Sequence, residues 1–297
     1  GSPEGASLTE QRTHAVLGLR SPLTPEQTAS RARRFGAVYY AEHWLRRMRG
    51  YGVTVLVTAV GTPLVYLFGM GIGLASLVDT GTNAAFETGN GNSVSYLMFV
   101  APALLATAAI MVSSEENTYT VMSGFKWRRT YYGPNASPLS SGQLVDGHVL
   151  GLGVRLLITC GAYFAFLLLF GAAGNPATAW LMIFTAILGG LAFGLPLMAY
   201  SASITEDRGQ FAMVQRFIVM PLFLFSGTFF PLDTGPVIIR WIGWISPLWH
   251  ATELGRLFSY GLAEPAALTV VHVAYLLVLA AGGWVLARRT FTRRLGK

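Results

Sequence analysis

The sequence predicts an all-α integral membrane protein with six transmembrane helices, and three observations support this. Of the 297 residues, 53% are hydrophobic and only 12% are charged, about half the charged share of a soluble domain. Several mostly apolar runs approach the roughly 20 residues that a helix needs to cross a bilayer core of about 30 Å. Lys and Arg gather in alternate connections between these runs. The runs are residues 53–78, 94–112, 156–173, 177–200, 211–230 and 266–287.

The distribution of Lys and Arg also predicts the orientation. The N-terminal region, the loop near 113–148 and the C-terminal tail are rich in basic residues, whereas the loops near 79–93 and 174–176 contain none. Basic loops stay in the cytoplasm, so we expect a multi-pass plasma membrane protein with both termini cytoplasmic. The net charge of +7 follows from this bias, and nucleic acid is not an expected partner. The first 50 residues are polar and basic, so no cleavable signal peptide is predicted.

The N-terminal region divides in two. Residues 1–30 are interpreted as a flexible cytoplasmic tail. Residues 31–50 predict an amphipathic helix on the cytoplasmic membrane surface, with tyrosines and Trp44 at the level of the lipid headgroups. The alternative is a solvated lead-in to the first spanning helix. The spaced positions that indicate the helix are Phe35, Val38, Tyr39, Glu42, Leu45 and Met48.

The second loop predicts a short cytoplasmic helix over residues 114–129. Ser113 and Glu116 have the spacing of a capping box, and basic residues at the other end suit the helix dipole. Tyr119, Met122 and Phe125 share one face. Such a helix lies flat on lipid or docks into another protein.

Motifs of catalysis are absent from the sequence. The chain has no ATP-binding G-x-x-x-x-G-K-[ST] loop, no H-E-x-x-H and no G-x-S-x-G. Its five His residues are scattered and its single Cys160 allows no disulfide within the chain. We therefore expect no catalytic residue, no metal site and no cofactor in this chain. Arg155, near the start of the third run, is interpreted as an interfacial anchor, with an ion pair near the loop as the alternative.

Glycine and tryptophan patterns add two expectations. Gly69–Gly73 and Gly190–Gly194 match G-x-x-x-G, which permits close helix approach in lipid. In 226–256, Trp241 and Trp244 share a helical face between two prolines. This predicts a short re-entrant or interfacial piece that forms a lid on the external side; the alternative is an external loop that only touches lipid.

The segment SGTFFPLDTGPVIIRWIGWISPLWHATELGR, residues 226–256, resembles the signature after the fifth helix in permeases of the ABC-2 type exporter family. The matching positions are Gly227, Phe229, Phe230, Pro231, Pro247, His250, Glu253 and Arg256. Residues 115–140 and the stretch TPLVYLFGMGIGL at 62–74 are similar to the lipo-oligosaccharide, or nodulation-factor, branch. The resemblance covers residues 35–290.

The resemblance implies an architecture. Residues 31–50 become a connecting helix, 51–290 a six-helix transmembrane domain with re-entrant helices between helices five and six, and 291–297 a basic cytoplasmic tail. It also implies a dimer, with the same chain or a related permease, and two ATPase subunits that bind ATP and Mg. The helix 114–129 would be the coupling helix, with ATPase contacts at Glu115, Glu116, Tyr119, Met122, Phe125 and Arg128.

The resemblance implies a substrate path between the two permeases, lined by helices two and five. Path candidates are Met98, Phe99, Phe217, Met220 and Phe223; external lid candidates are Phe229, Phe230, Pro231, Trp241, Trp244, Pro247, His250 and Glu253. Ordinary packing is the alternative for each path residue. The expected function is outward transport of an amphipathic substrate, such as a lipid-linked glycan, glycolipid or hydrophobic drug. The alternatives are a membrane-embedded lipid-carrier transferase and a non-transporting scaffold.

Overall fold

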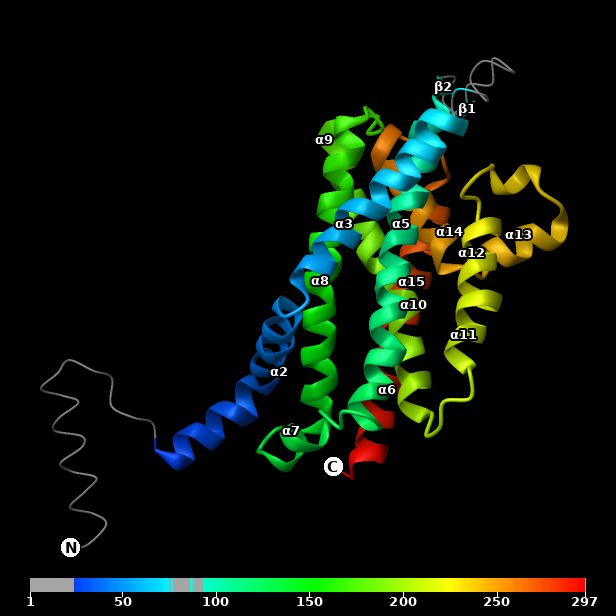
Figure 1. Ribbon diagram of the computed structural model, residues 1–297. Coiled ribbons are helices and arrows are strands. Elements are labelled where there is room, and N and C mark those ends of the chain that lie inside the picture. The colour runs from blue at the N-terminus through cyan, green and yellow to red at the C-terminus, as the bar shows by residue number, and fades with distance from the viewer. Residues whose placement is uncertain (1–23, 75, 77–85, 88–92, 297) are drawn as a thin grey trace, which may run out of the picture.

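The computed structural model describes residues 24–74, 76, 86–87 and 93–296, which form a bundle of helices with a small hairpin at one end (Figure 1). The first half contains α2 (Pro25–Arg49), α3 (Gly52–Tyr66), the π-helix η1 (Leu67–Leu74), strands β1 (Phe86–Glu87) and β2 (Ser93–Val94), α5 (Tyr96–Asn117), α6 (Tyr119–Phe125), α7 (Tyr132–Ala136) and α8 (Ser141–Leu169). The two strands pair antiparallel, with Phe86 opposite Val94.

The second half is also helical. It contains α9 (Pro176–Ala179), α10 (Met182–Ser203), α11 (Gln210–Val214), the π-helix η2 (Gln215–Val219), α12 (Met220–Phe225), the 3-10 turn η3 (Leu232–Thr234), α13 (Val237–Trp244), α14 (Pro247–Tyr260) and α15 (Ala266–Leu295). The expectation of an all-α membrane fold is confirmed.

Among the described residues, four helical segments are long and apolar enough to cross a membrane. They are Tyr96–Phe125, Ser141–Leu169, Pro176–Ser203 and Ala266–Leu295. The fifth predicted run is the shorter apolar helix Gln210–Phe225, which at 1.5 Å per residue reaches about 24 Å, less than a bilayer core of about 30 Å. The first run follows α3 and η1 as far as residue 74 and then leaves the described part of the chain. Six spans therefore remain a prediction.

Helix α2 begins before the predicted boundary at residue 31. Thr24 and Gln27 form a capping box that starts it at Pro25, so the helix includes part of the predicted tail. The backbone departs from helical geometry at Phe35, with φ −116° and ψ 16°.

Trp44 faces protein and not lipid, and its predicted depth at the headgroups stays a prediction. Its side chain is only 3% exposed and packs on α8, where its ring centroid lies 5.9 Å from that of His148. Gly151 leaves the room that the indole fills, because a Cβ there would lie 2.6 Å from the Trp44 ring. This face of α2 thus binds protein, while Tyr39 on the other face is exposed.

The centre of the bundle is a close crossing of α5 and α10. A Cβ on Gly190 would lie 3.1 Å from the carbonyl oxygen of Ala109, and one on Gly194 would overlap Ser113. Tight packing at this G-x-x-x-G motif is confirmed. Nothing lies within 4 Å of a Cβ built on Gly69, so that motif packs on no other helix of the described chain.

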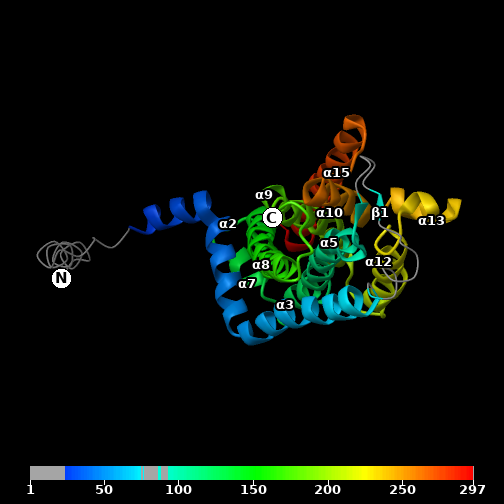
Figure 2. The same ribbon diagram turned by 90° about the horizontal axis from the view of Figure 1, so that it is seen from above.

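The helices and strands mark two opposite ends of the bundle. In Figure 1, α6, α7, the start of α2 and the C-terminal end of α15 lie at one end, and the hairpin, α9 and the segment from η3 to α14 lie toward the other. Figure 2 shows α8, α10 and α5 gathered centrally, with α3 along one side and α13 projecting outward. We call the first the inner end and the second the outer end.

Candidate functional site

The segment between α5 and α8 differs from the predicted helix over 114–129. Helix α5 continues to Asn117, so Ser113 and Glu116 lie inside it and form no capping box. Side chains hold this end together: Asn117 Nδ2 donates to the Ser113 carbonyl at 2.7 Å and Thr118 Oγ1 to the Ser114 carbonyl at 2.9 Å. The capping box lies instead at Ser140 and Gln143, where it starts α8.

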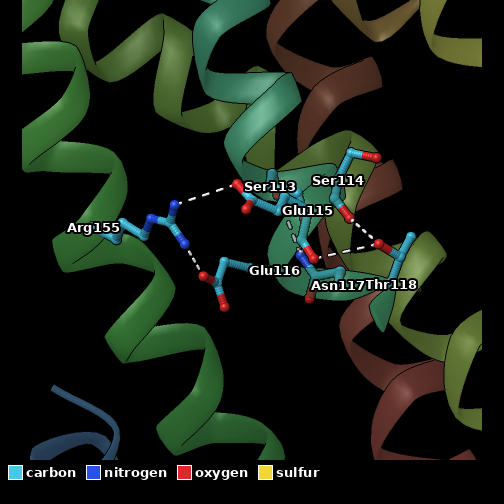
Figure 3. A network of polar contacts seen from close by, with 7 residues as sticks. All are labelled: Ser113, Ser114, Glu115, Glu116, Asn117, Thr118 and Arg155. Carbon is cyan, nitrogen blue, oxygen red and sulfur yellow. Dashed lines mark hydrogen bonds and ion pairs between the residues drawn. The ribbon is translucent and has the colours of Figure 1, made fainter. Parts of the chain in front are cut away.

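Arg155 of α8 joins the inner end of α5 (Figure 3). Its guanidinium pairs with Glu116 and lies 3.3 Å from Glu115 Oε2. Arg155 is 5% exposed and Glu116 only 3%. A buried charge requires a partner, and this one has two. The interpretation of Arg155 as an interfacial anchor is therefore wrong, and the alternative of an ion pair near the loop is correct.

The predicted ATPase contacts divide into exposed residues and buried residues. Glu115, Tyr119 and Arg128 are exposed. Glu116, Met122 and Phe125 are buried, so they cannot touch a partner directly. The buried residues are well packed: Met122 clusters with Ile204 and Phe211, and the Phe125 ring lies 4.8 Å from Phe291.

Trp127 belongs with the exposed residues, although the sequence analysis did not select it. It is 52% exposed and stacks with Tyr119 at a centroid distance of 6.4 Å and an angle of 19°. We call the exposed set Glu115, Tyr119, Trp127 and Arg128 the inner face. The sequence signal that could have identified Trp127 is its position among three basic residues, Lys126, Arg128 and Arg129.

The predicted lid also divides in two. Trp241 and Trp244 on α13 are 60% and 46% exposed, with ring centroids 5.1 Å apart. Pro247 and His250 belong to α14 and are buried. The segment 229–231 is irregular and packs inward, because the Phe229 ring lies 5.1 Å from Phe223.

Arg256 secures the outer end, and the sequence gave it only as a motif position. It is 2% exposed. Its guanidinium pairs with Glu253 at 2.7 Å, donates to the Gly227 carbonyl at 2.7 Å and lies 3.8 Å from the centroid of the Phe99 ring. One side chain thereby ties α14 to the irregular segment and to α5. Burial raises the pKa of Glu253, and the Arg256 charge opposes this.

Two of the scattered His residues meet at the outer end. The Nδ1 atoms of His250 and His272 lie 2.6 Å apart, and His250 Nε2 lies 2.9 Å from the Trp244 carbonyl oxygen. His272 Nε2 lies 3.3 Å from Glu264 Oε2. Burial lowers the pKa of His250 to about 4. In the described part of the chain, no group of three or more His, Cys, Asp or Glu side chains could hold a metal.

The predicted path residues do not share one surface. Phe217 and Met220 are 71% and 51% exposed, on η2 and the start of α12. Phe99 lies under Arg256, and Phe223 is buried with its ring 5.8 Å from Tyr66. Met98 is half-buried. Of the five candidates, Phe217 and Met220 are the most open to a second chain or a substrate.

Comparison with known proteins identifies relatives. The family model described as ABC-2 type transporter matches residues 37–258. Nodulation protein J of Rhizobium leguminosarum bv. viciae is 26% identical over 267 residues, which cover 88% of this chain and 96% of the relative. Nodulation protein J of Rhizobium meliloti (strain 1021) is 25% identical over 259 residues, 85% and 92% of the two chains. The protein of the same name from Bradyrhizobium diazoefficiens is 26% identical over 260 residues, 85% and 92%.

Proposed function

The chain belongs to the ABC-2 type transporter family, and from this membership we propose that it moves an amphipathic substrate outward with energy from a separate ATPase. It is a multi-pass membrane protein and the membrane subunit of an ABC exporter. Its own chemistry is transport and not catalysis. ATP and Mg would bind in the partner, in two ATPase copies beneath a pair of permease chains, identical or related.

The inner face supports the ATPase contact, and it is the observation on which the proposal depends. Interfaces of this kind combine exposed aromatic and Arg side chains with a rigid base. Tyr119 stacks with Trp127, and its ring also lies 5.0 Å from that of Phe211, which is fully buried and clusters with Met122. The face lies at the same end as the start of α2 and the end of α15 (Figure 1). These segments are rich in Arg, so the positive-inside rule makes this the cytoplasmic end.

The Arg155–Glu116 pair would pass motion from that face into the bundle. Glu116 lies one residue from exposed Glu115, and its partner Arg155 belongs to the long helix α8. A push on the inner face therefore moves α5 and α8 together, because separating the pair would leave two buried charges unmatched.

Two observations support an amphipathic substrate. The relatives are named nodulation proteins, and the resemblance is to the lipo-oligosaccharide branch. Phe217 and Met220 present exposed apolar surface on the fifth helix, which suits an acyl or aromatic portion. We propose a lipo-oligosaccharide or similar glycolipid as the substrate class, at a path between two permease chains in the plasma membrane.

The test is co-purification with candidate ABC ATPase subunits. We expect the double substitution Trp127→Ala and Arg128→Glu to lower ATPase recovery at least fivefold, since truncating an aromatic or Arg hot spot costs about 1–2 kcal/mol or more. Both side chains are exposed, so the chain should keep its own melting temperature.

The matched control is Arg293→Glu, which reverses an exposed charge at the same end, in the last turn of α15. It should leave ATPase recovery within twofold of the unmodified chain. Equal recovery of the ATPase with the double variant and with the control would remove the inner face as the contact.

A further inference from the structure

The inner face forms part of the wall of a cavity of about 700 Å³. Its walls come from the end of α2, the start of α3, the junction of α5 and α6, and α8. The lining residues are Arg47, Tyr51, Thr54, Val55, Glu115, Glu116, Tyr119, Thr120, Ser123, Trp127, Arg128 and Arg155. Its volume is that of a small-molecule or headgroup site.

The charges of the lining favour an anion. Three guanidinium groups outnumber two carboxylates. Arg155 forms ion pairs with both Glu115 and Glu116. Arg47 and Arg128 form no ion pair with another described residue. Arg155 is 5% exposed and its Nε has no hydrogen-bond partner within the described chain. Glu116 Oε2 is likewise buried without a hydrogen-bond partner in the described chain, so the charge available to an anion comes from Arg47 and Arg128.

The position of the cavity favours a lipid. Arg47 and Tyr51 lie where α2 passes into α3, the first predicted span, so the cavity lies at the depth of the headgroups. Tyr and Trp side chains are favoured at that depth, and Tyr51, Tyr119 and Trp127 all line the cavity. Val53 and Val57 of α3 are 77% and 61% exposed and offer an apolar surface for acyl chains next to it.

We propose that this cavity binds the phosphate headgroup of an anionic lipid in the cytoplasmic leaflet. Basic pockets between membrane helices on this side suit acidic headgroups, and Arg recognises phosphate through paired N–H donors. Arg47 and Arg128 supply the positive charge that faces the headgroup. The bound lipid fills the gap between α2–α3 and α5–α6. The proposal requires no ATPase, although the cavity shares Glu115, Tyr119, Trp127 and Arg128 with the inner face. Arg47 lies outside the inner face and therefore separates the two proposals.

The test measures lipid binding to the full chain, purified alone in detergent. Phosphatidylglycerol and phosphatidylcholine are titrated and bound lipid is counted by native mass spectrometry. We expect phosphatidylglycerol to bind about tenfold more tightly, and Arg47→Gln to weaken its binding about tenfold, since a hydrogen bond to a charged group contributes about that factor. Arg128 is left in place because it also belongs to the inner face.

The control is Arg46→Gln, which removes the same charge from the adjacent residue of α2. Arg46 is exposed and paired with Glu42, outside the cavity, so binding should stay within twofold. Equal affinities for the Arg47 and Arg46 variants, or for the two lipids, would overturn the proposal. Loss of ATPase recovery with Arg47→Gln at unchanged lipid affinity would assign the cavity to a protein contact and overturn it too.

A third arm separates a lipid from a soluble phosphate. Glycerol phosphate carries the phosphate of phosphatidylglycerol without acyl chains. We expect it to displace phosphatidylglycerol only at concentrations at least a hundredfold higher, because burial of apolar chain contributes about 0.8 kcal/mol per CH₂. Displacement at equal concentration would make the site one for a soluble phosphate and would overturn the assignment to a membrane lipid.

Discussion

Loss of Arg155 should destabilise the bundle. This residue joins α8 to the end of α5, and it lies 40 residues from Glu115 in the sequence. Removing one member of a buried pair costs about 3–5 kcal/mol, whereas replacing both by apolar residues is often nearly neutral. We expect Arg155→Leu to lower the melting temperature strongly and Arg155→Leu with Glu116→Leu to recover most of the loss. The measurement is thermal unfolding in detergent, and a double variant less stable than the single would contradict the pairing.

His250 should make stability depend on pH at the outer end. Burial lowers its pKa from 6.5 to about 4, so the folded chain favours the neutral ring. The contribution is fully present above pH 6.5 and is lost as the pH falls toward 4, because the unfolded chain takes up the proton first. We expect the melting temperature in detergent to fall as the pH is lowered from 7 to 5.

The control for this pH dependence is His250→Gln, which keeps a polar side chain and removes the titration. Its melting temperature should fall less between pH 7 and pH 5 than that of the unmodified chain. The neighbouring His272 and Glu264 stay in place in both chains. An identical slope in the two would show that His250 is not the group responsible.

At the scale of elements, adjacent glycines of α15 test the helix packing. A Cβ on Gly283 would lie 2.6 Å from the Leu195 carbonyl carbon and overlap Pro196 of α10, whereas one on Gly282 meets nothing within 4 Å. We expect Gly283→Ala to destabilise the bundle by about 1–3 kcal/mol and Gly282→Ala to be neutral or slightly stabilising through helix propensity. Thermal unfolding of the two variants measures the difference, and equal melting temperatures would refute this crossing of α10 and α15.

Apolar runs predicted where most helices lie, since lipid requires every backbone group to bond within its helix. They did not predict where the helices end. Helix α8 begins at Ser141, well before the predicted start at 156. Its first half is too polar to be found as an apolar run, but it still forms a helix because α2 and α15 pack against it. The sequence held the right start signal, since Ser140 and Gln143 have the same capping-box spacing that was read at Ser113 and Glu116. Local spacing cannot tell which of two such motifs is used.

The candidate site was less predictable than the helices, because its residues meet only through the fold. His250 with His272 and Arg256 with Phe99 come from different elements, and no pattern within one element pairs them. Amphipathic spacing placed Tyr119, Met122 and Phe125 together but could not say that Met122 and Phe125 face the core. The inner-face and lid assignments that involve partners remain predictions.

For the whole molecule, the separation of an inner and an outer end predicts which residues face the cytoplasm. Cys160 is the only cysteine and is buried, so Cys160→Ala gives a background for labelling. We expect a membrane-impermeant maleimide to label Trp241→Cys in intact cells, and Arg293→Cys only after permeabilisation, since both positions are exposed but lie at opposite ends (Figure 1). Trp180→Cys, exposed on the connection between α9 and α10, is a second outer probe. Labelling of Trp241→Cys only after permeabilisation would put α13 in the cytoplasm and remove the external lid, because an inner α13 could not close a path on the outside.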